Sequence, residues 1–599
     1  MPDTASPLYW KRKLAAYLHD PPEKPYDFGP RHIERAGIHA LSFGVDELWK
    51  RMGSNSDWTS AAADRFVFPS GQAIGKNLGE DLRPCFIHPL SGKENQPALP
   101  TDALKFPGQA EAEEWLGDIR PDWKSEDPHT LFLRAWRHWS GYAAQHPKGR
   151  EKGAGLLPYL PADTRIADGS IWHHCAIVSA LESTRSSDEP GAPLKPAFLL
   201  FQIGPVQDFI AQARSTRDLW SGSYLLSWLT MHAIKAVADH CGPDAILFPS
   251  LKGQPLYDFL EQQRLGLEQD FAKAARQEDV LVPGIPNRFL AVVPQDFDAE
   301  AIVAAAFKTE WHTIAATCRA WLEKEGIGFD AHHDQLWENQ IASHWQLTWQ
   351  LWPWQSADAA LTAFQQIPLG RENAIHLAKA VAEAIPDAHK DSRCYRDGKL
   401  DPGWAWSAHY QLCQHALDAR RSLRDFHGLP TDFTRKPGHR DALSGREEAV
   451  LQAEAMEEAV KKSTALKHLF RHIEPLGAAN LIKRVWHKAY LARLQEVEGK
   501  KHLPNLTRAR ESFDSVPSVA AGAFASRLYQ RAEKEGPLRE KWLAFLTAAS
   551  DARDDFPETI ANFQDSSEPI WISRTDNSVF VSDLWSKELT RTKVASSTE

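Results

Sequence analysis

The sequence predicts a multidomain α+β protein, and three observations lead to this prediction. The chain of 599 residues is long enough for about three to five domains of ordinary size. An apolar run at residues 197–201 predicts a buried strand, and a helical pattern follows it at once. From about residue 330 onward the pattern is mostly helical. The contents of hydrophobic residues (43%) and charged residues (25%) are typical of globular proteins.

The first predicted element is a short amphipathic helix over residues 8–18. It ends at His19-Asp20, because Pro21 and Pro22 cannot continue a helix and bias the residue before them toward extended angles. In HD phosphohydrolases an adjacent His-Asp pair binds divalent metals, which activate water and hold a phosphodiester. A histidine at the end of a helix also caps the helix dipole, so the dipeptide alone leaves both roles open.

A linker is predicted at residues 182–196, a stretch that is rich in Ser, Pro, Gly and charge. It marks the first domain boundary, which separates a helical N-terminal domain at 1–190 from the module that begins with the buried strand. The N-terminal domain carries the His-Asp pair.

The module at residues 191–330 begins with a strand that stops at Gly204-Pro205. A helix with one apolar face follows, and we expect it to break at 221–223, where a second helix starts. The run 288–294 predicts a strand that pairs back, and 299–325 predicts an amphipathic helix. Strand, helix, strand and helix of this length predict a ferredoxin-like, palm-type domain.

Two mainly helical regions are predicted after this domain, at residues 331–450 and 451–599. The second contains a basic stretch: residues 461–510 hold twelve Lys or Arg and three Asp or Glu, whereas the whole chain has a net charge of −10. A bound nucleic acid would lie along this stretch rather than over the whole surface. A solvated helix face explains the same pattern, and both interpretations stay open.

Composition argues against several classes of protein. No apolar run reaches about 18 residues, so no transmembrane helix is predicted, and the N-terminus lacks the apolar core of a signal peptide. The six cysteines are scattered and form no CxxC, which fits a reduced cytoplasm and argues against a thiolate zinc site. We therefore expect a cytoplasmic protein with no membrane partner.

Several stretches resemble one known family. GPVQDFI (204–210) and ARSTRDLWSGSYLLS (213–227) resemble the first palm-like domain of the large subunit of type III-B (Cmr) CRISPR RNA-guided effector complexes. LHDPPEKP (18–25), AADRFVFPS (62–70) and the stretch 156–183 resemble, in family order, the permuted HD domain of that subunit. Further similar stretches follow in order to about residue 530.

The resemblance implies a metal-dependent nuclease for single-stranded DNA in the HD-like domain. The implied metal ligands are His19, Asp20, Asp64 and His174, and the implied catalytic pair is His19 and Asp20. Ligands of mixed nitrogen and oxygen type suit Mn²⁺, Ni²⁺, Co²⁺ or Mg²⁺, and we predict no zinc.

The chain departs from the family pattern at the proposed metal site. Gly169 stands where the family usually has His, and His173 stands where it usually has Asp. His173 or Asp168 could compensate for the lost ligand. Two further matching positions have open roles, because His88 is either structural or a ligand, and Lys24 either meets a phosphate or forms a salt bridge.

Two family motifs are absent from the sequence. The stretch 435–441, where the family usually has a cysteine-rich zinc knuckle, contains no cysteine, so we expect no metal there. No Gly-Gly dipeptide occurs, so the Gly-Gly-Asp-Asp loop that makes cyclic oligoadenylate from ATP is missing, and independent ATP binding is not expected. The chain is then either the N-terminal part of a split, truncated or interrupted subunit, or a lineage that dispensed with cyclase activity.

The leading hypothesis is a large subunit of a type III-B antiviral effector, or its N-terminal part, with an HD domain that cuts single-stranded DNA. Its expected partners are the other subunits of the complex and, indirectly, crRNA and target RNA. One alternative is a scaffold subunit with a decayed HD site, which the loss of a histidine at Gly169 favours. A stand-alone HD phosphohydrolase is a third hypothesis, and it leaves most of the chain unexplained.

Overall fold

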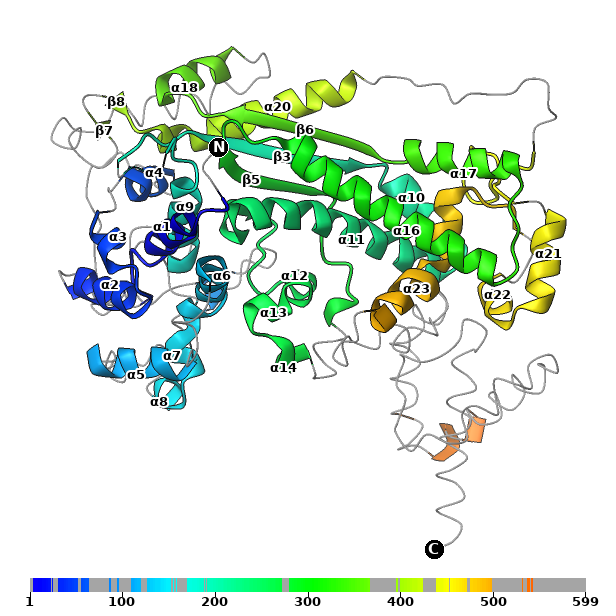
Figure 1. Ribbon diagram of the computed structural model, residues 1–599, viewed down its shortest axis with the longest axis horizontal. Coiled ribbons are helices and arrows are strands. Elements are labelled where there is room, and N and C mark those ends of the chain that lie inside the picture. Colours follow the sequence, from blue (N-terminus) through cyan, green and yellow to red (C-terminus); the bar gives the residue numbers. More distant parts are fainter. Residues whose placement is uncertain are drawn as a thin grey trace, which may run out of the picture.

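The computed structural model describes most of the chain up to residue 497. Apart from gaps of one to three residues, the described ranges are 4–22, 31–51, 55–63, 109–119, 127–151, 170–271, 279–366, 395–423 and 438–497, with Lys24 and a few other short pieces. Figure 1 shows one antiparallel sheet in the middle of the molecule, helices of the first 190 residues at one end, and helices of residues 453–497 at the other. The protein is therefore an α+β protein that is mostly helical, as the sequence predicts at this level.

The central sheet contains four strands: β3 (Pro196–Gly204), β4 (Ile246–Phe248), β5 (Arg288–Pro294) and β6 (Gln346–Pro353). Their order is β4-β5-β3-β6, and every neighbouring pair is antiparallel. Leu200 in the middle of β3 lies opposite Leu290 of β5 and Gln350 of β6. Along the chain, the long helices of this domain follow β3 and precede β4, and follow β5 and precede β6.

Helices cover both faces of the sheet (Figure 1). On one face lie α11 (Thr216–Cys241) and α16 (Ala305–Lys324), which the π-helical turn η6 (Glu300–Ala304) precedes; on the other lies α20 (Trp406–Ser422), with α18 (Ala357–Gln365) packed on it. Along β3, Leu199 and Phe201 join the larger hydrophobic core, whereas Phe198 and Leu200 join a smaller core on the opposite face. Because both faces are buried, β3 is apolar without interruption.

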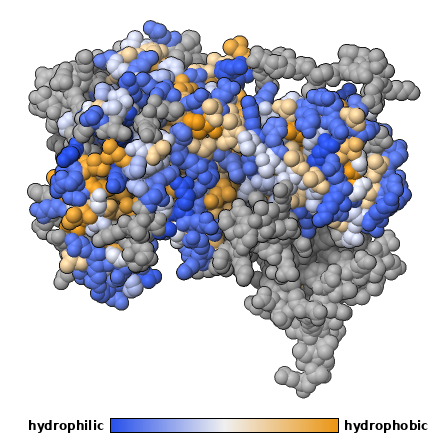
Figure 2. Space-filling model, viewed as in Figure 1, coloured by the Kyte–Doolittle hydropathy of each residue, from blue (hydrophilic) through white to orange (hydrophobic). Residues whose placement is uncertain are grey.

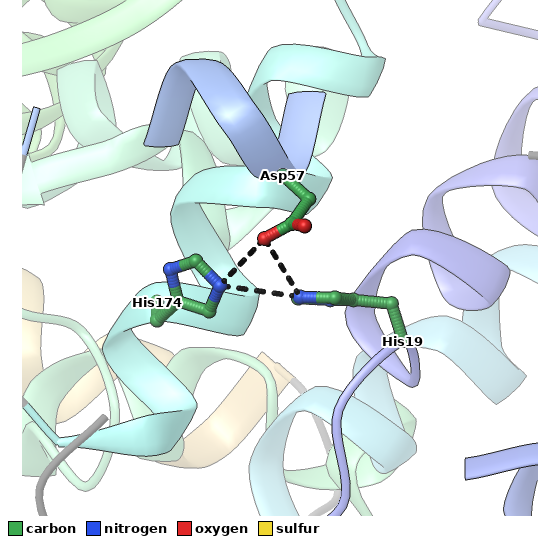
Figure 3. Close-up of side chains that lie close together, drawn as sticks. All are labelled: His19, Asp57 and His174. Carbon is green, nitrogen blue, oxygen red and sulfur yellow. Dashed lines mark hydrogen bonds and ion pairs between the residues drawn. The ribbon is translucent and has the colours of Figure 1, made fainter. Parts of the chain in front are cut away.

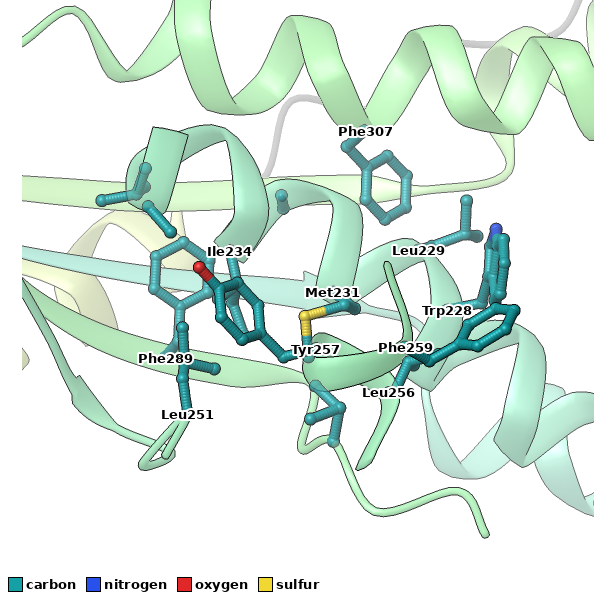
Figure 4. Close-up of a cluster of buried hydrophobic side chains, with 14 of the residues drawn as sticks. Trp228, Leu229, Met231, Ile234, Leu251, Leu256, Tyr257, Phe259, Phe289 and Phe307 are labelled. Carbon is teal, nitrogen blue, oxygen red and sulfur yellow. The ribbon is translucent and has the colours of Figure 1, made fainter. Parts of the chain in front are cut away.

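The larger core lies between α11 and the sheet (Figure 4). Met231 and Ile234 of α11, Phe289 of β5 and Tyr257 of α12 (Pro255–Leu260) are all fully buried in it. Full burial of one such side chain stabilises a fold by about 1.5–3 kcal/mol. The sheet domain is therefore a firmly packed body against which the N-terminal helices dock.

The N-terminal part is helical. Its described helices are α1 (Pro7–Tyr17), α2 (Arg31–Ser42), α3 (Asp46–Arg51), α4 (Asn55–Ala63), α5 (Gln109–Ile119), α6 (Pro128–His138), η3 (Trp139–Gly141), α7 (Tyr142–Gln145), α8 (Pro147–Glu151) and α9 (Ile171–Glu182). The structure confirms the predicted first helix: Ser6 caps α1 by accepting a hydrogen bond from Leu8 N at 3.3 Å, and α1 ends at Tyr17, just before His19. The short pairs β1 (Phe86–Ile87) with β2 (Glu94–Asn95) and β7 (Tyr395–Arg396) with β8 (Lys399–Leu400) complete the strands.

The expected break at residues 221–223 is wrong. These residues lie inside α11, and the break falls earlier, between α10 (Gln207–Ala211) and the N-cap of α11 at Ser215, whose side chain accepts from Asp218 N at 3.2 Å. The small residue Gly222 has a packing role instead. A Cβ there would lie 3.1 Å from Lys483 Cδ and 3.5 Å from Ile210 Cα, so glycine lets α10 and α23 (Ala478–Val497) approach α11 closely.

The helical pattern expected after residue 330 is partly wrong as well. After α17 (Ala331–Ser343) the chain forms the edge strand β6, which pairs with β3 and so extends the sheet beyond residue 330. Leu347, Trp349 and Leu351 alternate along β6 and pack against the larger core. This period of two is the signal of a strand with one buried face.

The structure describes residues 461–470 and 474–497 of the basic stretch at 461–510. Its described helices are the end of α21 (Ala453–Lys462), then α22 (Thr464–Leu469) and α23. On α23, Lys483 donates to Phe209 O at 2.8 Å, and Arg484 pairs with Asp218 and Glu474 at 2.6 and 2.7 Å. These two cations join α23 to α10 and α11, and for the rest of the stretch both interpretations stay open. In the described part of the chain, no helix is long and apolar enough to cross a membrane.

We expect Gly242→Ala to destabilise the fold. Gly242 ends α11 with φ +95° and ψ 152°, a region that side chains rarely adopt, and an added Cβ would lie 2.2 Å from Asp244 Oδ1. The expected loss is about 1–3 kcal/mol in the free energy of unfolding, measured in urea by tryptophan fluorescence. Gly326→Ala is the matched control, because Gly326 has the same φ but open space around it. Equal losses in the two variants would contradict a role for the close contact.

Candidate metal centre

His19 lies just past the end of α1, with one ring nitrogen fixed by the backbone. Its Nδ1 lies 2.8 Å from Ala16 O, which can only accept a hydrogen bond, so Nδ1 carries the proton. In the neutral ring Nε2 is then an unprotonated acceptor, and it points into the cluster drawn in Figure 3. A histidine that binds a metal is commonly oriented by such a bond from its other nitrogen.

His174, in the first half of α9, faces His19. Its Nδ1 lies 3.1 Å from Ser60 Oγ of α4, and its Nε2 lies 3.2 Å from His19 Nε2. Two neutral Nε2 acceptors at this distance would repel each other. Without a metal, Ser60 can donate to His174 Nδ1, and a proton on His174 Nε2 then satisfies the pair; with both Nε2 atoms unprotonated, a metal ion could bind between the rings.

Asp57 of α4 completes the group, and the sequence reasoning missed it. Its Oδ1 lies 3.2 Å from His174 Nε2 and 3.8 Å from His19 Nε2. The three ligand atoms lie within 4.8 Å of one another (Figure 3). Asp57 and Ser60 are three residues apart and so share one helix face, with Asp57 facing the outer nitrogen of His174 and Ser60 the inner one.

Asp20 lies on another side of the two histidines. Its Oδ2 is 3.3 Å from His19 Nε2 and 3.8 Å from His174 Nε2, and the residue is 4% exposed. The same oxygen forms an ion pair with Lys24, four residues further along the chain. Of the two roles considered for Lys24, the structure shows the salt bridge.

The opposite charges in the cluster stabilise one another's ionised forms. Burial opposes the charged form of His19, but the carboxylate of Asp20 outweighs it and raises the pKa of His19 well above its usual value. Burial likewise opposes ionisation of Asp20 and Asp57. Lys24 and His19 nevertheless hold the pKa of Asp20 well below its usual value, and a hydrogen bond to His174 with the nearby His19 lowers the pKa of Asp57. The site thus favours positive charge between two carboxylates.

Hydrogen bonds hold the three segments of the site together. Lys13 of α1 donates to Ser179 O of α9 at 3.1 Å, and Ser179 Oγ donates back to Lys13 O at 3.0 Å. On α4, Ser56 Oγ donates to Glu182 of α9 at 2.7 Å, and Thr59 Oγ1 donates to Asp401 at 3.2 Å, next to η8 (Pro402–Ala405). The positions of the ring and carboxylate atoms are therefore set by α1, α4 and α9 packing on one another.

Of the remaining positions named from the sequence, the structure describes His173 alone. Asp64, His88, Asp168 and Gly169 lie outside the described residues. His173 is exposed, with its Nδ1 2.9 Å from Ser170 Oγ and its ring stacked on Trp172, and it is not part of the cluster.

The donor set fits a divalent metal. Two imidazole nitrogens and two carboxylates are ligands of mixed type, which suit Mn²⁺, Ni²⁺ or Co²⁺. Among the described residues, one other group has comparable spacing, Glu114, Asp118 and His146, but its two acids are exposed and Glu114 is paired with Lys148 at 2.7 Å. The candidate metal centre is therefore the cluster at the junction of α1, α4 and α9.

Comparison with known proteins identifies relatives of the chain. Residues 198–316 match the family described as CRISPR-associated protein Cmr2, N-terminal. The chain is 28% identical over 329 residues to the CRISPR system Cmr subunit Cmr2 of Pyrococcus furiosus, an alignment that covers 47% of this chain and 35% of that protein. It is 37% identical over 109 residues to the CMR subunit Cmr2 of Saccharolobus solfataricus, covering 18% and 10% of the two chains. The matched part thus spans about a third or less of these relatives.

Solved structures share the fold. A chain of the type III-B Cmr-beta complex in the apo state matches with a TM-score of 0.54 at 17% identity, covering 87% of this chain and 55% of that chain. A chain of Cmr-beta bound to cognate target RNA matches with a TM-score of 0.50 at 16% identity, covering 88% and 54%. At this level of identity the likeness concerns the fold.

The sheet domain contains most of the residues that match the CRISPR-associated family, and the fold of the chain is similar to that of chains in type III-B Cmr-beta complexes. More particularly, the comparisons relate it to Cmr2, the large subunit of type III-B Cmr complexes: residues 198–316 match the Cmr2 N-terminal family, and 329 residues align with a curated Cmr2 at 28% identity.

Proposed function

We propose that the chain acts as the large subunit of a type III-B effector complex, or as part of one, and that its HD-like domain is a metal-dependent nuclease for single-stranded DNA. The observation that carries the nuclease proposal is the convergence of His19 Nε2 and His174 Nε2 at 3.2 Å, with Asp20 and Asp57 beside them. Such a group of side chains could hold a divalent cation, and its nitrogen and oxygen atoms suit the metals used by hydrolases.

A bound metal would supply an activated water and a charge that holds the phosphodiester. The chain's own residues fix the geometry. The carbonyl of Ala16 orients His19, and Ser60 orients His174, so that both outer nitrogens face the same point. Asp57 and Asp20 bring the negative charge that a divalent cation requires, and Asp20 shares its charge with Lys24.

In this proposal the βαββαβ sheet with order β4-β5-β3-β6 is the ferredoxin-like, palm-type domain. Its partners are the other subunits and, indirectly, crRNA and target RNA, which the likeness to a Cmr-beta structure bound to cognate target RNA supports. The 599 residues contain no Gly-Gly dipeptide, so we assign no cyclic oligoadenylate synthesis to this chain.

A cleavage assay tests the nuclease proposal. Purified protein is incubated with labelled single-stranded DNA and Mn²⁺, Ni²⁺ or Mg²⁺, beside the double variant His19→Ala/Asp20→Ala and the control His173→Ala, which changes an exposed histidine next to the site. We expect cleavage by the wild type and the control, its loss in the double variant, and its loss with EDTA. Cleavage that survives the double change would rule out this site.

The scaffold alternative has one observation in its favour. Lys24 already places a cation on Asp20, so the cluster keeps part of its charge balance without a metal. A scaffold would show no cleavage with any of the three metals, even with target RNA and partner subunits added, while still entering the complex.

A further inference from the structure

Lys252 connects the sheet domain to the N-terminal helices. It lies in the loop between β4 and α12, so its backbone belongs to the sheet domain. Its Nζ donates to Ser140 Oγ of η3 at 2.5 Å and to Tyr17 Oη of α1 at 3.2 Å, and it lies 4.7 Å from the centre of the Trp172 ring of α9. One side chain therefore touches three separate segments of the neighbouring domain.

Two of these contacts lie next to the candidate metal centre along the chain. Tyr17 precedes His19 by two residues, and Trp172 precedes His174 by two residues. The rings of these two histidines must face one point to bind a cation, although they come from opposite ends of the N-terminal domain. Lys252 therefore contacts, at the same time, one residue that lies two positions before each of the two histidines.

The surroundings of Lys252 are costly for an ammonium group. None of the ion pairs among the described residues includes it, and it has hydroxyl groups and aromatic faces as partners instead. Burial, together with the nearby Arg137 guanidinium, lowers the pKa of Lys252 to about 7. An apolar side chain of similar length would avoid this cost. The hydrogen bonds of Lys252 to Tyr17 and Ser140 point to a positional role that an apolar side chain could not fill.

We propose that Lys252 is a positioning residue, which locks the segments that carry His19 and His174 onto the sheet domain through Tyr17, Ser140 and Trp172. It does not touch the cluster itself. The role of Lys252 in metal binding rests on the proposed function. Its role in fixing the two segments does not depend on that function.

Removal of Lys252 should leave the two domains docked. The fully buried pair of Lys13 Nζ and Asp244 Oδ2 joins α1 to η5 (Pro243–Ala245) at 2.7 Å, and Arg137 of α6 binds Asp258 of α12 through two bonds of 3.0 and 2.7 Å. These pairs do not involve Lys252. A Lys252→Met variant, which keeps the length of the side chain, is therefore expected to fold.

The test compares Lys252→Met with Lys252→Arg and with Lys308→Met, which changes an exposed lysine on α16 of the same domain. Hydrogen exchange of the intact proteins without metal is the first readout. In Lys252→Met we expect about 10-fold faster exchange in α1 near Tyr17 and in α9 near Trp172, and no change in α11. Arg keeps the charge and the donors and should restore most of the protection. Unchanged exchange in both segments would overturn the proposal.

Binding of Mn²⁺ is the second readout and separates the two proposals. If the cluster binds Mn²⁺, the dissociation constant should rise about 10-fold in Lys252→Met and stay near the wild-type value in Lys308→Met, as for partners that orient metal ligands. An unchanged dissociation constant would overturn the role of Lys252 at the metal. If the wild type binds no Mn²⁺ while the exchange result holds, the proposed function fails and the positioning role stands.

Discussion

Asp57→Asn is expected to abolish binding of Mn²⁺ and metal-dependent cleavage while leaving the fold intact. The substitution keeps the size and shape of the side chain but removes the negative charge 3.2 Å from His174 Nε2 and 3.8 Å from His19 Nε2. A neutral amide is a poor ligand for a divalent cation between two imidazoles. We expect affinity and cleavage rate to fall by more than about 100-fold, because loss of a group that only orients a ligand already costs 10–100-fold.

Calorimetric titration with Mn²⁺ and the cleavage assay with labelled DNA would measure both effects. Glu47→Gln is the matched control, since it removes one exposed carboxylate from α3 in the same domain. A melting temperature close to that of the wild type would show that Asp57→Asn acts on the site. Wild-type affinity for Mn²⁺ in the Asp57→Asn protein would mean that Asp57 is not a ligand.

The candidate site was predictable to different degrees at different residues. The end of α1 before His19 follows from Pro21 and Pro22, which no tertiary contact can override. The place of His174 beside His19 was implied by resemblance to a family and not by any local pattern. Asp57 was missed because nothing in a short helix with few large apolar side chains indicates which face meets α9. The spacing of three residues between Asp57 and Ser60 becomes informative only in the structure, where both side chains contact the imidazole of His174.

As at the site, the elements of the fold that local sequence patterns determine were predicted, and those that depend on tertiary packing were not. The buried strand β3 and the helix α16 follow from hydrophobic periodicity and were predicted within a few residues, apart from the π-helical turn before α16. The helix break expected at Gly222 failed because this glycine serves the packing of α10 and α23 against α11, which the local sequence does not show. The strand β6 carried a visible alternation at Leu347, Trp349 and Leu351, but it was read as part of a helical region because α17 directly precedes it.

Asp244→Ala is expected to be among the most destabilising single substitutions at the junction of the two domains. Lys13 and Asp244 are both fully buried, and their charged atoms lie 2.7 Å apart. Burial lowers the pKa of Lys13 and raises that of Asp244, so each charge is costly without its partner. Removal of Asp244 leaves the Lys13 ammonium with the carbonyl of Ser179 as its remaining polar contact. The expected loss is about 3–5 kcal/mol in the free energy of unfolding.

The double variant Lys13→Met/Asp244→Ala distinguishes the cost of an unpaired charge from the value of the pair. With both charges gone, Met fills the space of the lysine stem beside the Phe132 ring, and we expect the double variant to recover most of the stability that Asp244→Ala loses. Urea unfolding compares the wild type, Asp244→Ala and the double variant. Lys50→Ala on α3 is the control, because it removes an exposed ion pair whose loss costs about 0–1 kcal/mol. If the double variant is as unstable as Asp244→Ala, the pair itself stabilises the junction, and the argument from an unpaired buried charge is wrong.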